Sequence, residues 1–199
     1  QTLETYPPKD AFAKLDGMFA IAAYNFIEKT IFLARDRWGK KPLYFYSDDN
    51  HFSYSSDIRS FSKINKRLTI NNDGLKFYFT ELSLPQPQTI FNEISQVKPG
   101  HFLEIKNNII KEFEYFNLFG KEFKDTSHYN TKNVSKTTQE LLFKAIEKRQ
   151  FADVDVGAFL SGGIDSGLIV SIASKNKDSL NTYTVGFEDE SIDERPFAK

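Results

Sequence analysis

The pattern of apolar residues changes near residue 120, and this change constrains the fold more than any other feature of the sequence. Before it, short apolar runs alternate with polar turns, which predicts an antiparallel meander of hairpins. After it, amphipathic segments alternate with apolar runs, which is the rhythm of a parallel α/β sheet. We therefore predict an α+β part followed by an α/β part.

The predicted hairpins occupy the first part of the chain and use paired apolar runs. The pairs join residues 18–24 with 30–35, 43–46 with 51–55, and 102–105 with 109–113. A short helix over residues 72–81 is expected to interrupt the meander, with Asn72 or Asp73 as its N-cap. The 20 Phe and nine Tyr residues agree with a β-rich core in this part.

A polar, charged stretch without a clear period separates the two parts. We interpret residues 119–130 as a linker between a first domain at 1–118 and a second domain at 131–199. The second domain is predicted to contain a helix at 131–149, a buried strand at 154–160, a helix at 165–175 and a further strand at 181–187.

The composition limits the kinds of partner and site that the sequence supports. With 26 Lys and Arg against 27 Asp and Glu, the net charge is −1, so nothing favours a nucleic-acid or membrane partner. The absence of cysteine excludes disulfides, thiolate metal sites and thiol nucleophiles from these residues. The three histidines are widely spaced and predict no metal site. The chain begins with Gln1, has no signal-peptide pattern and stops after a helix-start signal, so we expect an internal fragment.

The segment SGGIDS at residues 161–166 carries the clearest chemical signal, because it joins a predicted strand to a predicted helix. Glycines there let backbone N–H groups point outwards, and the helix N-terminus adds partial positive charge, which suits a phosphate. Ser161 and Ser166 offer hydroxyl donors to phosphate oxygens. Asp165 fits such a site if it holds Mg²⁺, which in turn bridges the phosphates.

The same segment also fits a plain glycine-rich turn in which Asp165 and Ser166 only cap the helix, and local chemistry leaves both interpretations open. Neither a Walker loop nor a G-x-G-x-x-G fingerprint occurs. The acidic stretch at 188–194 could hold a second magnesium ion, but we favour a solvated loop in which Ser191 and Glu194 form a capping box.

The run Arg35-Asp36-Arg37 could form an active site or a structural ion-pair cluster at the end of a strand. We favour the structural interpretation, because charge clusters usually organise loops. Trp38 is expected in the core rather than on a ligand-binding surface.

Several segments resemble one enzyme family in the family's own order. Residues 161–166 resemble the S-G-G-x-D-S pyrophosphate loop of the ATP pyrophosphatase superfamily, and VGAFLSGGIDS at 156–166 is similar to its asparagine synthetase version. LDGMFA at 15–20 and RDRWGKKPLY at 35–44 resemble the second half of a class II glutamine amidotransferase domain. Gly167 departs from the family, which often has a second Ser there.

The resemblance to glutamine-hydrolysing asparagine synthetases implies a fold and a nucleotide site. The implied fold is the C-terminal part of an αββα class II glutaminase sandwich, followed by the start of a Rossmann-like ATP pyrophosphatase domain. ATP and Mg²⁺ are the implied cofactors, with Asp165 as the magnesium ligand. Leu160 and Val185 would place backbone groups against the adenine or ribose. The implied ATP-binding residues are Leu160, Ser161, Gly162, Gly163, Asp165, Ser166 and Val185.

The resemblance also implies a reaction, in which aspartate, glutamine and ATP give asparagine, glutamate, AMP and pyrophosphate through an acyl-adenylate. Because such glutaminases use an N-terminal Cys and none is present, it implies no catalytic residue within this fragment and no activity of the fragment alone. It implies a cytoplasmic enzyme with small-molecule substrates, and a homodimer is allowed. Two alternatives stay open: a paralogue that amidates another carboxylate, such as a sugar acid, and a non-catalytic scaffold.

Overall fold

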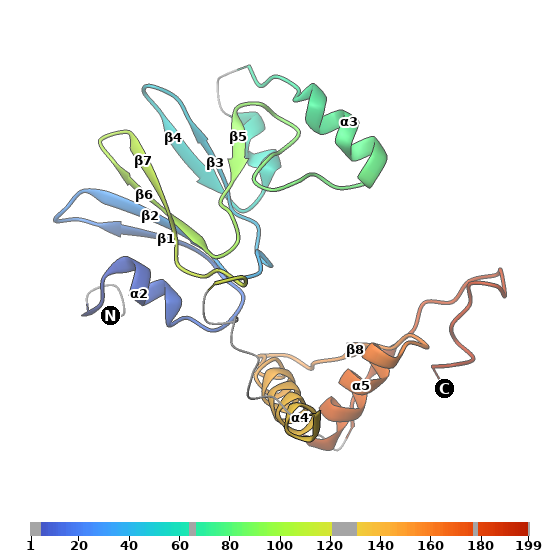
Figure 1. Cartoon of the computed structure of the whole chain (residues 1–199). Helices are drawn as coiled ribbons and strands as arrows, with labels where there is room; N and C mark the ends of the chain where they lie inside the picture. Colours follow the sequence, from blue (N-terminus) through green and yellow to red (C-terminus); the bar gives the residue numbers. More distant parts are fainter. Residues whose placement is uncertain (1–4, 64–66, 121–130, 177–178, 199) are drawn as a thin grey trace. The chain divides into compact units, whose positions relative to one another are not determined.

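The computed structural model describes residues 5–63, 67–120, 131–176 and 179–198, apart from the side chains of residues 131, 132 and 176. The chain divides into two compact units, Gln1–Lys124 and Asp125–Lys199, which are described separately (Figure 1). The linker predicted at 119–130 lies outside the described residues, except for Phe119 and Gly120.

The N-terminal unit contains a four-stranded antiparallel sheet in the order β1-β2-β6-β7. Its strands are Ala20–Asn25, Thr30–Arg35, His101–Lys106 and Ile109–Glu114. A three-stranded antiparallel sheet has the order β4-β3-β5. Its strands are β3 Tyr44–Ser47, β4 Phe52–Ser55 and β5 Ile94–Gln96. The predicted antiparallel hairpins are therefore confirmed.

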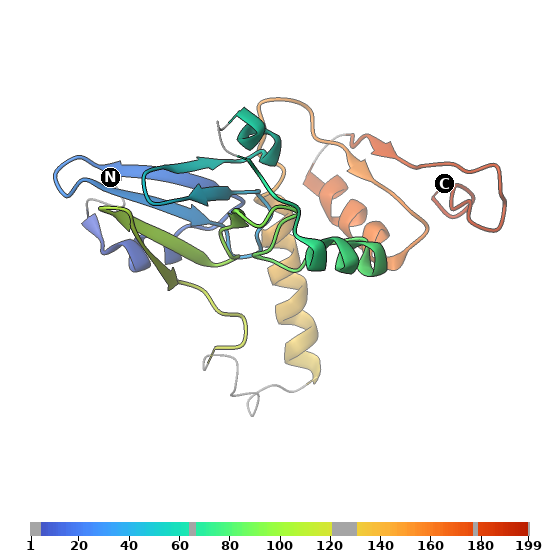
Figure 2. The same cartoon turned by 90° about the horizontal axis from the view of Figure 1, so that it is seen from above.

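The core of this unit lies between the two sheets, because alternate residues of a strand point to opposite faces. Leu33 and Leu103 of the larger sheet pack with Leu43 and Val97, which flank the smaller sheet. The helix α2 (Pro8–Ala13) lies against the opposite face of the larger sheet (Figures 1 and 2). Phe12 of this helix packs with Ala34 and Phe102 of the sheet. The 3₁₀ helix η1 (Ile58–Lys63) packs on the smaller sheet.

The helix α3 (Asn72–Glu81) begins one residue earlier than the predicted caps allow. Its N-cap is Asn71, whose side-chain oxygen accepts the amide of Gly74 at 2.9 Å, so the predictions of Asn72 and Asp73 as caps were wrong. The helix ends at Leu82, which adopts a left-handed conformation with φ of 53°.

The C-terminal unit alternates helices with short strands. Its elements are α4 (Thr131–Glu147), β8 (Ala158–Phe159), α5 (Ile164–Ala173), η3 (Ser174–Asn176) and β9 (Thr182–Tyr183). The two strands pair in parallel, as the alternation predicted. None of the helices in the described part of the chain has the length and apolar character needed to cross a membrane.

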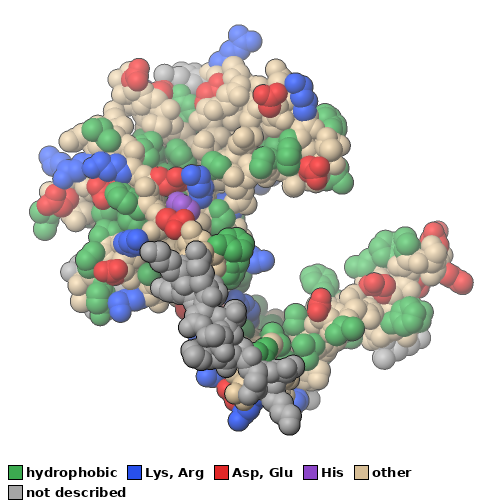
Figure 3. Space-filling view, in the orientation of Figure 1, with side chains coloured by type: hydrophobic (Ala, Val, Ile, Leu, Met, Phe, Trp, Pro, Cys, Tyr) green, Lys and Arg blue, Asp and Glu red, His purple; other side chains and the backbone are tan. Residues whose placement is uncertain are grey.

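The predicted strands at 154–160 and 181–187 were wrong in extent, and the prediction that the first is buried was also wrong. Each strand has only two residues, and Phe159 and Tyr183 are 82% and 58% exposed. Among the described residues each of these strands pairs only with the other, so little covers their apolar faces. Figure 3 shows hydrophobic side chains at the surface of this unit.

Candidate functional site

The candidate site begins where β8 ends and α5 starts. Leu160 donates its amide to the carbonyl of Tyr183 at 2.9 Å, which fixes the last residue of the β8 segment against β9. Residues 161–163 then turn the chain, and Gly163 is the N-cap of α5. Because no side chain caps this helix, its first amides remain available to another acceptor.

Two serine hydroxyl groups hold the turn in shape. Ser166 Oγ lies 2.9 Å from Ser161 Oγ and accepts the amide of Ser161 at 3.2 Å. It also lies 3.0 Å from the carbonyl oxygen of Gly163 and 3.1 Å from that of Ser161. The amide of Gly163 is directed at Ser161 Oγ at 3.3 Å. The structure therefore brings both serines together as internal supports of the loop, whereas the sequence suggested hydroxyl donors aimed at phosphate.

The backbone of the turn is open. Gly162, Gly163, Ile164 and Asp165 are all exposed. In the described part of the chain, no hydrogen bond engages the amides of Gly162, Ile164 or Asp165. Three N–H groups near a helix N-terminus thus remain free to donate to an anion. A plain capped turn would have used Asp165 or Ser166 as the cap, and neither caps α5.

The glycines of the turn differ in how much space surrounds them. A Cβ on Gly162 would lie 2.6 Å from Cβ of Phe197, so any other residue here would have to displace Phe197. Phe197 is itself 78% exposed, so it contacts the turn without enclosing it. A Cβ on Gly167, in α5, would meet no atom within 4 Å.

Asp165 lies in the first turn of α5 with an exposed side chain. No ion pair or hydrogen bond of its carboxylate occurs within the described ranges of the chain. An exposed oxygen ligand beside free amides fits a magnesium ion that also contacts phosphate. Among the described residues, no group of three or more His, Cys, Asp or Glu side chains is arranged to hold a metal ion.

Leu160 and Val185, the residues expected near the adenine or ribose, end the two parallel segments. Leu160 is already engaged on both sides, because its carbonyl accepts the hydroxyl of Thr184 at 2.7 Å. Val185 is 62% exposed, and its backbone makes no hydrogen bond within the described residues. Thr184 was not recognised as a functional residue in the sequence, because it lies inside the predicted strand 181–187; in the structure it directly follows β9.

The acidic stretch at 188–194 forms turns rather than a capped helix, so the predicted capping box was wrong. Ser191 donates its hydroxyl to Asp189 at 2.7 Å, and this bond lowers the pKa of Asp189. Arg195 pairs with Asp193 at 2.8 Å and lowers the pKa of that carboxyl. Both carboxylates are satisfied locally.

The burial of Arg35 and Asp36 agrees with the structural interpretation that we favoured, but no ion pair of either side chain occurs among the described residues. Arg35 is 3% exposed and Asp36 is 0% exposed. The Arg35 guanidinium donates to neutral oxygens at 2.8–2.9 Å: the carbonyls of Gly39, Lys41 and Val97 and the side chains of Gln86 and Gln96. The hydroxyl of Tyr115 donates to the carbonyl of Arg35 at 2.5 Å.

Asp36 accepts backbone amides instead of a guanidinium. The amides of Trp38, Lys40 and Lys41 donate to its carboxylate at 3.1, 3.0 and 2.9 Å. Burial by itself would raise the pKa of Asp36, but these donors outweigh it and hold the pKa below its ordinary value. Trp38 is 55% exposed, so its prediction as a core residue was wrong: it follows β2 in a turn outside the sheets.

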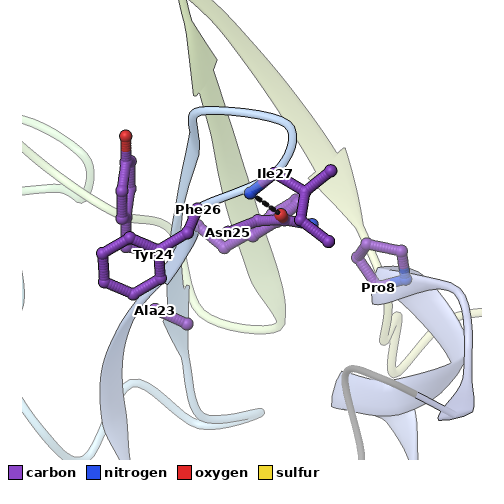
Figure 4. Close-up of a pocket in the computed structure, with 7 residues that line it drawn as sticks. Pro8, Ala23, Tyr24, Asn25, Phe26 and Ile27 are labelled. Carbon is purple, nitrogen blue, oxygen red and sulfur yellow. Dashed lines mark hydrogen bonds between the residues drawn. The ribbon is translucent and has the colours of Figure 1, made fainter.

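The N-terminal unit also has a cavity of about 700 Å³ between α2 and the β1–β2 hairpin (Figure 4). Its lining consists of Pro8, Ala23, Tyr24, Asn25, Phe26, Ile27 and Phe32 and has no charged side chain. The side-chain oxygen of Asn25 accepts the amides of Ile27 and Glu28 at 3.0 Å, so it supports the hairpin turn. This cavity offers little polar chemistry compared with the open turn.

Two known sequence families match this chain, one in each compact unit. The sequence family described as a glutamine amidotransferase domain matches residues 3–116, and the family described as asparagine synthase matches residues 137–199. The chain belongs to the glutamine-hydrolysing asparagine synthetase family. Its turn at 161–166 lies within the asparagine synthase match.

Individual asparagine synthetases are similar along nearly the whole chain. "Putative asparagine synthetase [glutamine-hydrolyzing] 2" of Methanocaldococcus jannaschii is 32% identical over 197 residues, which cover 96% of this chain and 37% of that protein. "Asparagine synthetase [glutamine-hydrolyzing] 1" of Bacillus subtilis is 31% identical over 191 residues, covering 96% of this chain and 30% of that protein. The chain therefore spans about a third of the length of these synthetases.

Proposed function

We propose that the turn at 161–166, together with Leu160 and Val185, forms the ATP site of an asparagine synthetase that takes its amide nitrogen from glutamine. The observation that carries this proposal is the turn at 161–166, where three backbone amides and the Asp165 carboxylate are exposed and have no partner within the described chain. The names of the relatives support the synthesis of asparagine with glutamine as the nitrogen source. The geometry of the turn at 161–166 supports the binding of ATP.

The amides of Gly162, Ile164 and Asp165 donate to the terminal phosphates of ATP, and the α5 N-terminus adds partial positive charge. Ser161 and Ser166 hold these amides in place through their mutual hydrogen bond. Asp165 would hold Mg²⁺, and the ion would supply positive charge for the phosphates. Leu160 and Val185 bound the adenine or ribose at the ends of the two strands.

The overall reaction has two displacements in the complete protein. The side-chain carboxylate of aspartate attacks the α-phosphorus of ATP, and pyrophosphate leaves to give an acyl-adenylate. Ammonia from glutamine then attacks the acyl carbon, and AMP leaves with asparagine as the product. The 199 residues contain no cysteine, so we assign glutamine hydrolysis to a nucleophile outside them.

The same proposal covers the organisation of the protein. We assign residues 1–118 to the C-terminal part of an αββα glutaminase sandwich and residues 131–199 to the start of a Rossmann-like ATP pyrophosphatase domain, joined by a linker at 119–130. Glutamine, aspartate and ATP are the proposed substrates in the cytoplasm, and a homodimer is allowed.

Substitution of the magnesium ligand tests the proposal. In the complete protein, Asp165→Ala should lower ATP–pyrophosphate exchange by about 100-fold or more, because Mg²⁺ loses its protein ligand, while glutaminase activity persists. Asp153→Ala is the matched control, since Asp153 is an exposed carboxylate outside the turn. Unchanged exchange in the Asp165 variant would refute the metal role. Formation of asparagine from aspartate by the wild type separates this enzyme from paralogues that amidate other carboxylates.

A further inference from the structure

The hydrogen bonds between β8 and β9 stop abruptly beside the turn. The amide of Ala158 donates to the carbonyl of Asn181, and that of Leu160 to the carbonyl of Tyr183, both at 2.9 Å. In a parallel ladder the bonds are evenly spaced, so the next one would run from the amide of Val185 to the carbonyl of Leu160. That bond is not formed between these two described residues.

A side chain takes the acceptor that this bond would have used. Thr184 Oγ1 donates to the carbonyl oxygen of Leu160 at 2.7 Å. Thr184 is half-buried, whereas the neighbouring Val185 is exposed. The hydroxyl therefore ends the ladder, and the N–H and C=O groups of Val185 are left without a partner in the described chain.

The released backbone lies at the carboxyl end of both strands, where Ser161 begins the turn. Ligands of parallel α/β sheets bind outside this end. Adenine presents an acceptor ring nitrogen and a donor amino group close together, which a backbone N–H and C=O can match. Val185 has both groups free, so it can recognise the base while the turn binds the phosphates.

We propose that Thr184 is a positioning residue of the nucleotide site: its hydroxyl closes the ladder at Leu160 and so presents the Val185 backbone to adenine. This inference rests on the proposed function, because it takes ATP as the ligand of the turn. Thr184 contacts no nucleotide atom and acts through Leu160 and Val185.

If the hydrogen bond from Thr184 to Leu160 only stabilised the two strand ends, a different result would be expected. Its loss would loosen the strands and the adjoining turn together, so adenine and pyrophosphate binding would weaken alike. Loss of the positioning role weakens only ligands that contain adenine, because pyrophosphate meets the amides of the turn.

The test uses Thr184→Val and Thr184→Ser in the complete protein, followed by ATP–pyrophosphate exchange. Valine keeps the shape but removes the donor, which lets the ladder extend to Val185, whereas serine keeps the donor. We expect Thr184→Val to raise the KM for ATP and the Ki for AMP about tenfold, with kcat and the KM for pyrophosphate within about twofold of the wild type. Thr184→Ser should keep all four constants close to the wild-type values.

Each result of this experiment either supports or overturns the positioning role of Thr184. An unchanged KM for ATP in Thr184→Val overturns the inference, and so does an equal rise in the KM for pyrophosphate. A wild type without exchange overturns the proposed function and this inference together, which distinguishes the two failures. Melting temperatures of the variants report on folding, and Thr184→Ala replaces the valine variant if that protein does not fold.

Discussion

Arg35 and Asp36 in the N-terminal unit and Asp165 in the C-terminal unit all lie beside glycine-containing turns, yet their surroundings are opposite. The first two are almost fully buried, and backbone or amide groups satisfy them. Asp165 is exposed beside free amides. A buried polar group must be paired inside the protein, whereas an exposed, unpaired one can exchange water for a ligand. The structural cluster and the candidate site therefore differ in whether their polar groups already have hydrogen-bond partners within the protein.

The largest effect is expected at the centre of the buried cluster. Arg35→Ala should lower the free energy of unfolding by about 3–5 kcal/mol, because several buried acceptors lose their donor. Urea denaturation followed by the fluorescence of Trp38, the only tryptophan of the chain, reports on this unit. Arg59→Ala is the control: its ion pair with Asp57 is exposed, so no measurable loss is expected. Similar losses in both variants would break the comparison.

A second effect concerns pH. The pKa of Asp36 is lowered in the folded protein, so its contribution to stability is complete above the ordinary value of about 4 and is lost as pH falls through the folded pKa. Asp36→Asn should cost about 1–3 kcal/mol at neutral pH, and this cost should shrink in acid.

The measurement is the difference in unfolding free energy between wild type and Asp36→Asn across the acid range. Asp49→Asn, which changes an exposed carboxylate, should show no such trend. A cost for Asp36→Asn that stays constant with pH would mean that the amides around Asp36 do not favour its charged form.

The smallest expected change in stability comes from replacing a glycine, and we compare one glycine from each region. Gly167→Ala should stabilise α5 by about 0.5–1 kcal/mol, because the new methyl group meets no atom within 4 Å. Gly39→Ala should destabilise the N-terminal unit, since Gly39 has a φ of +61° and the methyl group would lie 2.9 Å from Pro99. Thermal melting by circular dichroism gives both signs. A destabilised Gly167 variant would show that the region beside the turn is less open than the structure indicates.

Features that depend on neighbouring residues in the chain could be predicted from the sequence. The hairpins, the parallel alternation and the glycine turn before α5 were all recognisable, because side-chain period and turn chemistry act over a few residues. The N-cap at Asn71 was missed by one residue, since neighbouring Asn and Asp side chains can all serve as caps.

Features that depend on distant partners could not be predicted. Trp38 was placed in the core because of its size, but nothing local shows that it follows β2 in a turn outside the sheets. The strands at 154–160 and 181–187 were expected to be longer, because an apolar run does not reveal how many neighbours will cover it.

The sequence by itself determined the two architectures, the position of the turn at 161–166 and the family resemblance, since these follow from local pattern. Only the tertiary structure decided which polar groups are buried with hydrogen-bond partners and which are exposed without them. It joined Arg35 to Gln86 and Gln96, and Thr184 to Leu160. Hydrogen bonds across such distances in sequence depend on how the strands meet, and no local pattern encodes that meeting.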